Sequence, residues 1–113
     1  RRIETEAIRK RVREIRCGSP MVLALGGGAF VQQANYEMLE ENGVSIWLDC
    51  PFEVLKRRVE RETHRPLARD PEKFKALYEE RRPYYSRADF RVEATGDDPA
   101  EAVEAVLALP IFR

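Results

Sequence analysis

Apolar residues recur along the first part of the chain at the spacing of an amphipathic helix. Over residues 1–16 they stand three to five positions apart among Arg, Glu and Lys, at Ile3, Ala7, Ile8, Val12 and Ile15. Residues at this spacing share one helical face, so the pattern predicts a helix that is apolar on one side. Cys17-Gly18-Ser19-Pro20 predicts its end, because glycine suits a helix C-terminus and proline cannot continue the helix.

Three short runs predict β-strands. Met21–Leu25 has no polar member, which favours a strand that is buried on both faces within a parallel sheet. Val44–Leu48 is rich in β-branched and aromatic residues and predicts a second buried strand. Asp89–Ala94 is partly polar and predicts a short strand nearer the edge of the sheet.

Four further helices are predicted from their start and stop signals. They run from about Gln33 to Asn42, from Pro51 along the face of Phe52, Leu55 and Val59, from Asp70-Pro71 to an end or kink at Arg81-Arg82-Pro83, and from Asp98-Pro99 with Val103, Val106 and Leu107 buried. Residues 63–69 show neither the helical nor the strand spacing of apolar residues, which predicts an exposed loop. The alternation of helices and strands predicts a single α/β domain with layers of helices on a parallel sheet.

Three consecutive glycines, Gly26, Gly27 and Gly28, follow the first predicted strand. Residues without a Cβ let the backbone turn tightly and approach a ligand closely at the carboxyl edge of a sheet. The pattern therefore fits a ligand site, and it fits a plain loop between strand and helix equally well.

Composition excludes several classes of function. With 113 residues, the sequence allows at most one domain. The 20 basic residues balance 20 acidic ones, so no global field attracts nucleic acid or an anionic membrane, and no apolar run is long enough to span a bilayer. Cys17 and Cys50 are too few for a disulfide framework and lack metal-ligand spacing, which favours buried or half-buried thiols in a reduced, cytoplasmic compartment.

A local cluster of basic residues interrupts this neutral balance. It consists of Arg57, Arg58, Arg61, His64, Arg65 and Arg69. Such a cluster is often a solvated helix face, but the irregular loop around Arg65 favours forked contacts with phosphate or carboxylate. Arg81, beside Pro83, also stands where a guanidinium can be held in one direction. His64 has no catalytic partner in the pattern and is interpreted as an exposed bystander.

Five motifs, in order, resemble those of the shikimate kinase family, P-loop kinases that phosphorylate shikimate with ATP and magnesium. They are Arg1-Arg2-Ile3-Glu4, Leu25-Gly26-Gly27-Gly28-Ala29, Arg65-Pro66-Leu67, Glu80-Arg81-Arg82-Pro83-Tyr84-Tyr85 and Thr95-Gly96-Asp97-Asp98-Pro99. Together they cover the whole chain. The resemblance implies a three-layer α/β/α fold of the P-loop kinase type and a monomeric enzyme.

The resemblance also implies a role for particular residues. Arg1 and Arg81 would clamp the carboxylate of shikimate, while the backbone of Gly26, Gly27 and Gly28 would face a substrate hydroxyl. For ATP, Arg65 would close with a lid at about residues 62–70 and neutralise charge on the transferring phosphoryl group. Arg58 and Pro99 would pack on the two faces of the adenine. Pro99 belongs to the adenine-binding loop, which also includes Asp98.

Two features of the family do not occur in these residues. The phosphate loop G-x-x-x-x-G-K-[ST] is absent, and so is the acidic pair that helps to hold Mg²⁺; no metal ligand is predicted here. We therefore expect residues 1–113 to be the C-terminal two-thirds of a domain whose central strand and metal ligands lie upstream of Arg1, and to be unstable and inactive alone. A ligand sensor without catalysis and a sister kinase for another polyol or sugar acid remain as alternatives.

Overall fold

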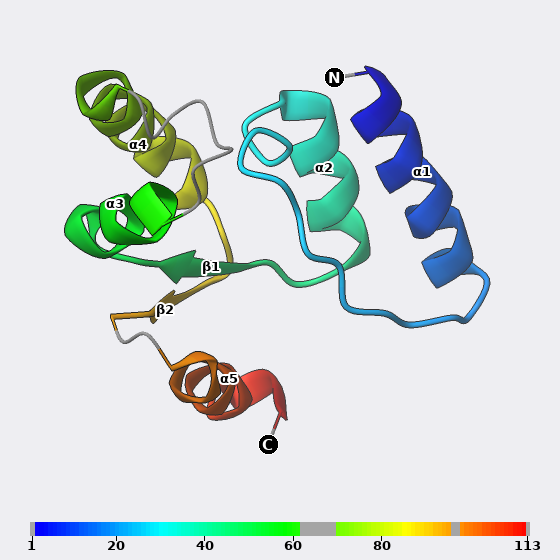
Figure 1. Ribbon diagram of the computed structural model, residues 1–113. Helices are drawn as coiled ribbons and strands as arrows, with labels where there is room; N and C mark the ends of the chain where they lie inside the picture. Colours follow the sequence, from blue (N-terminus) through cyan, green and yellow to red (C-terminus); the bar gives the residue numbers. More distant parts are fainter. Residues whose placement is uncertain (1, 62–69, 96–97, 113) are drawn as a thin grey trace. The chain divides into compact units, whose positions relative to one another are not determined.

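The computed structural model describes residues 2–61, 70–95 and 98–112, and it divides into two compact units, Arg1–Ser45 and Ile46–Arg113. The first unit contains the helices α1 (Arg2–Arg16) and α2 (Gln33–Asn42) (Figure 1). The second contains β1 (Ile46–Asp49), α3 (Phe52–Arg61), α4 (Pro71–Tyr85), β2 (Phe90–Glu93), α5 (Pro99–Leu107) and the short 3₁₀ helix η2 (Pro110–Phe112).

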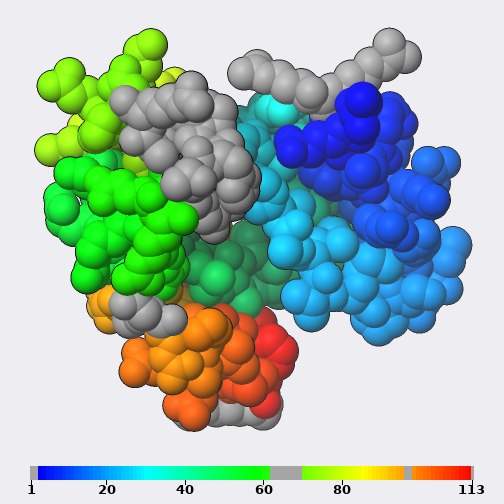
Figure 2. Space-filling model, viewed as in Figure 1, coloured from blue at the N-terminus to red at the C-terminus, as the bar shows by residue number. Residues whose placement is uncertain are grey.

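The first unit is a pair of helices that pack side by side (Figure 1, Figure 2). Ile8 and Val12 of α1 are buried together with Ala29, as the amphipathic pattern predicted. The same pattern placed Ile3 on the buried face, but its side chain is 86% exposed. At the far end of the pair, the Arg16 Nε donates to Asn42 Oδ1 at 2.8 Å and joins the two C-termini.

The segment Met21–Leu25 is not a β-strand. It has no regular secondary structure, and Val22 within it is 98% exposed. A strand exists only where a neighbour accepts and donates its backbone hydrogen bonds, and in the described part of the chain the only ladder joins β1 to β2. The prediction of a buried strand here is therefore wrong for this structure.

The second unit contains a two-stranded parallel sheet with helices around it, which confirms the predicted α/β class. β1 and β2 run in register from Ile46 opposite Phe90 to Asp49 opposite Glu93. Their ends are close to the predicted ones, except that β1 begins two residues later than the predicted start at Val44. Val92 of β2 is buried, while Leu48 of β1 remains 52% exposed.

Aromatic side chains join α3 to α4 in the second unit. The Phe52 ring lies 5.4 Å from the Phe74 ring and 5.5 Å from the Tyr78 ring, centroid to centroid. Separations in this range allow the edge of one ring to contact the face of another. The contacts fix the two helices against each other beside the end of β1.

The predicted starts of α4 and α5 are confirmed by their N-caps. Asp70 accepts a hydrogen bond from the Lys73 N–H, and Asp98 accepts one from the Ala100 N–H, each ahead of a proline. At the other end, α4 passes through Pro83 and stops two residues later.

Burial along α5 does not follow the prediction. Val103 and Leu107 are 55% and 57% exposed, although both were expected to be buried. The main contact of α5 among the described elements is with β2, and a strand of four residues is too short to cover a whole helix face.

The remaining predictions concern the lid loop, the two cysteines and membrane-spanning segments. The predicted loop and lid at about residues 62–70 lie outside them except for Asp70. Cys50 is buried as expected, but Cys17 is exposed. Within the described ranges, no helix is both long and apolar enough to cross a membrane.

Candidate functional site

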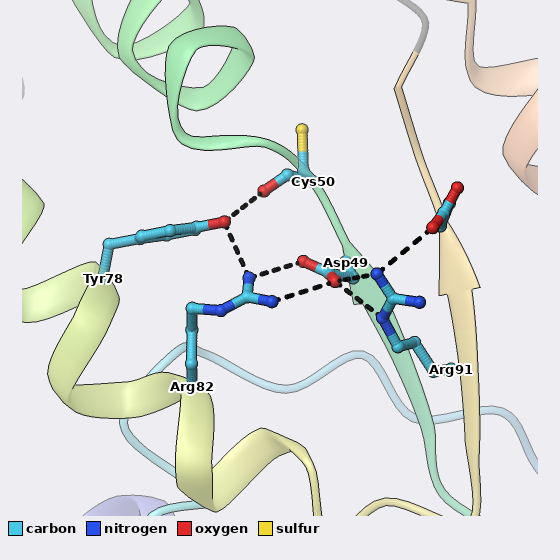
Figure 3. A network of polar contacts seen from close by, with 6 residues as sticks. Asp49, Cys50, Tyr78, Arg82 and Arg91 are labelled. Atoms are coloured by element: carbon cyan, nitrogen blue, oxygen red, sulfur yellow. Dashed lines mark hydrogen bonds and ion pairs between the residues drawn. The ribbon is translucent and has the colours of Figure 1, made fainter.

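An extensive polar network in the second unit is centred on Asp49, the last residue of β1 (Figure 3). Its carboxylate is buried, and Arg82 of α4 holds both oxygens, with Nη1 at 2.8 Å from Oδ1 and Nη2 at 3.3 Å from Oδ2. Arg91 of β2 approaches from the other side, with Nε at 2.7 Å from Oδ2. One carboxylate thus joins a helix and both strands.

Aromatic groups surround the same guanidinium groups. Tyr78 and Arg82 stand one turn apart on α4 and therefore face the same way. The Tyr78 hydroxyl accepts from Arg82 Nη1 at 2.7 Å and donates to the carbonyl of Cys50 at 3.0 Å. The Trp47 ring lies 4.9 Å from the Arg82 guanidinium carbon and 5.7 Å from that of Arg91. These contacts restrict both arginines to one direction.

The network holds Asp49 in its ionised form. The hydrogen bond from Arg82 lowers the pKa of Asp49, burial raises it, and the hydrogen bond from Arg91 lowers it further, with a net decrease. The same ion pair raises the pKa of Arg82. Because both carboxylate oxygens are occupied and the pKa is low, Asp49 is unsuited to general base catalysis near neutral pH.

An open pocket of about 260 Å³ lies against this network. Its lining consists of Asp49, Pro51, Tyr78, Arg82, Arg91, Glu93 and Thr95. Two acidic and two basic side chains balance in charge, so the pocket offers no excess positive charge for a phosphate. None of the predicted site residues that the structure describes lines it.

The predicted site residues of the second unit lie on three helices. Arg81 is half-buried on α4, directly before Arg82, and makes no ion pair with a residue that the structure describes. Arg58 is half-buried on α3. Pro99 is the first residue of α5 and Asp98 caps it. Arg65 lies outside the described residues.

The triple glycine lies in the first unit, where a turn leads into α2. The Ala29 N–H donates to the carbonyl of Gly26 at 3.1 Å, and Gly27 and Gly28 are within the turn that follows. A Cβ on Gly26 would stand 3.4 Å from Glu4 Oε2, so the backbone passes close to α1. Arg1, the other predicted substrate residue of this unit, lies outside the described residues.

A buried amide fixes the glycine turn. Asn35 of α2 is fully buried, and its Nδ2 donates to the carbonyl of Ala29 at 3.0 Å. Its Oδ1 is buried without a hydrogen-bond partner in the described part of the structure. A buried polar side chain with one strong bond holds the backbone that it contacts, so Asn35 ties the turn to α2.

The residues of the Asp49 network were not predicted as a site. Asp49 was assigned no role, and Arg81 was singled out without a role for Arg82. Two signals were present: an acidic residue that ends a buried strand, and a tyrosine and an arginine one turn apart on a helix. Arg91 gave no signal, because its partner is 42 positions away.

Within the described residues, no group of three or more His, Cys, Asp or Glu side chains could hold a metal ion. Mg²⁺ is held by oxygen ligands in an octahedral arrangement. Because Mg²⁺ often takes only one or two protein carboxylates together with waters and substrate phosphates, this excludes only a site built from three or more such side chains among the described residues.

Comparison with known proteins places the chain in a family. The sequence model of the family described as shikimate kinase matches residues 1–109. The shikimate kinase of Cereibacter sphaeroides is 48% identical over 80 residues, which are 68% of this chain and 40% of that protein. The shikimate kinase of Ruegeria pomeroyi is 46% identical over 95 residues, which are 80% of this chain and 49% of that protein. That of Caulobacter vibrioides is 47% identical over 92 residues, or 78% of this chain and 46% of that protein.

The chain spans about half the length of these curated relatives. A search of the solved structures gave no match. The family has a P-loop kinase fold, with which the helices and parallel strands of the second unit agree. On the match over residues 1–109, the chain belongs to the shikimate kinase family.

Proposed function

We propose that this chain supplies about half of a shikimate kinase, which transfers the γ-phosphate of ATP to the 3-hydroxyl of shikimate. The family match over residues 1–109 carries the proposal, and it includes the Arg-rich, glycine and adenine-loop motifs in order. Relatives at 46–48% identity bear the name shikimate kinase. The cytoplasm is the proposed compartment.

Arg81 is proposed as one side of the clamp on the substrate carboxylate. Its neighbour Arg82 is committed to Asp49, whereas Arg81 makes no ion pair with a described residue. An arginine with free donors can form two parallel hydrogen bonds to a carboxylate, which fixes both position and orientation. Arg1 is proposed as the opposite side, and the backbone N–H groups of Gly26–Gly28 as donors to a substrate hydroxyl.

For ATP, we propose that the adenine lies between Arg58 and Pro99. Asp98 supports this role indirectly, because its side chain holds the Ala100 N–H and so fixes the turn in which Pro99 begins α5. Arg65 is proposed as the lid residue that stabilises the charge on the phosphoryl group in the transition state of its transfer. Magnesium, when bound with ATP, would neutralise charge on the phosphates, and the described residues contain no group of three or more His, Cys, Asp or Glu side chains that could hold it.

The experiment is a steady-state assay of the full-length protein for ADP formation with shikimate and with gluconate. Arg81→Ala is expected to raise the KM for shikimate roughly tenfold or more and to leave the KM for ATP within about twofold, because only the carboxylate contact is lost. Arg65→Ala is expected to lower kcat mainly. Arg11→Ala, which removes an exposed pair with Glu14 on α1, is the control and should change neither constant.

Equal increases in both KM values for Arg81→Ala would contradict the clamp. An unchanged kcat for Arg65→Ala would remove Arg65 from phosphoryl transfer. Turnover of gluconate in place of shikimate would identify a sister kinase, and shikimate binding without ADP formation would identify a sensor.

A further inference from the structure

The last turn of α4 is not fixed by its backbone alone. Pro83 lies inside the helix and has no N–H to donate to the carbonyl of Glu79, one turn earlier. The turn is closed instead from its end, where the Ser86 N–H donates to the carbonyl of Arg82 at 2.9 Å and the Ser86 hydroxyl donates to that of Pro83 at 2.6 Å. Helices bend readily at such a proline, so side-chain contacts near it help to set the direction of the helix there.

Two side-chain contacts attach this part of α4 to the end of β1. Arg82 holds both oxygens of Asp49, and the Tyr78 hydroxyl donates to the carbonyl of Cys50 (Figure 3). Arg91 holds Asp49 from β2, so the carboxylate cannot turn away from α4. We call the three charged residues Asp49, Arg82 and Arg91 the strand-end joint.

The joint also determines which way Arg81 faces. Consecutive residues of a helix point about 100° apart around its axis. While Arg82 faces the strand ends, the Cα–Cβ bond of Arg81 leaves the helix in a different direction. Arg81 and Arg82 both lie in the turn that ends at Pro83 and lacks this hydrogen bond, so releasing Arg82 would let that turn bend, and the guanidinium of Arg81 would move with it.

We infer that Arg82 is a positioning residue that acts through Arg81, the strand-end joint holding the Arg81 guanidinium in the direction of the substrate carboxylate. This inference rests on the proposed function, in which Arg81 binds that carboxylate. It assigns Arg82 no contact with substrate. A planar guanidinium holds two oxygens in one plane, whereas a lysine ammonium keeps the charge without the direction.

The test uses the full-length protein with Arg82→Lys, Arg81→Gln and the double variant. Arg82→Lys should raise the KM for shikimate roughly tenfold while the KM for ATP stays within about twofold, because the charge is kept and the direction is lost. In the Arg81→Gln background, Arg82→Lys should raise the KM for shikimate no further. Arg11→Lys, on an exposed arginine of α1, is the matched control and should leave all constants unchanged.

Non-additivity distinguishes positioning from stability. A residue that acts only through Arg81 has nothing left to position once Arg81 is gone, whereas a residue that only stabilises the fold has the same effect in both backgrounds. Equal effects in the two backgrounds, or equal changes in both KM values, would overturn the inference.

A second variant covers the case in which Arg82→Lys does not fold. Asp49→Asn keeps the shape of the side chain and removes the charge from the joint, and it should give the same selective loss of affinity for shikimate. If neither variant folds at the assay temperature, the joint serves stability and the inference fails. An unchanged KM for shikimate in Arg81→Gln alone would instead contradict the proposed function.

Discussion

At the scale of single residues, two buried polar groups fix the backbone in this structure. Asn35 holds the carbonyl of Ala29 in the first unit, and Asp49 holds two arginines in the second. A buried polar group without its partner costs more free energy than the bond itself contributes. Both residues should therefore tolerate little change.

Substituting Asn35→Ala is expected to lower the free energy of unfolding by about 2 kcal/mol, because the carbonyl of Ala29 loses its donor and a small cavity opens. Urea denaturation of the full-length protein measures this loss. Glu37→Ala, an exposed residue of the same helix, is the control and should change stability by less than about 0.5 kcal/mol. A loss in Asn35→Ala no larger than the control would show that the bond does not hold the turn.

The strand-end joint should also make stability depend on pH in the acid range. Arg82 lowers the pKa of Asp49 below its ordinary value near 3.8, so the ionised carboxylate favours the folded state above that pH. The contribution of the Asp49 carboxylate to stability is lost as the pH falls through its lowered pKa, because Asp49 binds a proton at a higher pH in the unfolded chain than in the folded protein. The pKa values of Arg82 and Arg91 are raised, far above this range, and do not titrate in it.

The check compares wild type with Asp49→Asn in urea denaturation from about pH 6 down to pH 3. The gap in unfolding free energy between the two proteins should be widest near pH 6 and should narrow steadily below about pH 4. A gap that stays constant with pH would mean that the charge on Asp49 contributes nothing to stability.

At the scale of elements, helices begin where short polar side chains cap them. Asp98 lies at the start of α5, in the loop that we propose beside the adenine, and its Oδ1 accepts from the Ala100 N–H at 3.0 Å. The first N–H groups of a helix have no partner within the helix, so a side-chain acceptor stabilises that end. The cap therefore sets the position of Pro99.

Asp98→Ala should lower stability by about 1 kcal/mol, while Asp98→Asn should stay close to wild type because asparagine caps as well. Thermal unfolding of the three proteins measures the difference. If Asp98→Asn lowers stability as much as Asp98→Ala does, the stabilisation comes from the negative charge near the helix N-terminus and not from the hydrogen bond of the cap.

At the scale of the whole molecule, few apolar side chains of the described residues are buried. They are Ile8, Val12, Ala29, Phe30, Cys50, Val54 and Val92. Val22 and Val103 remain exposed, and a two-stranded sheet is only marginally stable. The buried area leaves little to offset the entropy of ordering the chain.

Residues 1–113 expressed alone should therefore unfold without a cooperative transition and form no ADP in the presence of shikimate. Circular dichroism on heating and a coupled ADP assay measure the two properties, with the full-length protein as the control. A sharp transition together with shikimate-dependent ADP formation would contradict this expectation.

The sequence by itself determined most helices, the caps at Asp70 and Asp98, the parallel α/β class and, through its ordered motifs, the family. These features depend on residues within a turn or two of one another, or on short motifs that can be read directly. Helical hydrogen bonds join residues four apart, so a local pattern contains nearly everything that a helix needs.

Only the tertiary structure decided that Met21–Leu25 is not a strand, that Val103 is exposed and that Arg82, not Arg81, holds Asp49. Each depends on what lies beside a residue in space. A strand needs a neighbour for its backbone, and a buried carboxylate needs cations, which here come from 33 and 42 positions along the chain. Periodicity along the sequence reports only on neighbouring residues. The pairings of the strand-end joint therefore cannot be predicted from it and are seen only in the folded structure, where Arg82 of α4 and Arg91 of β2 both contact Asp49.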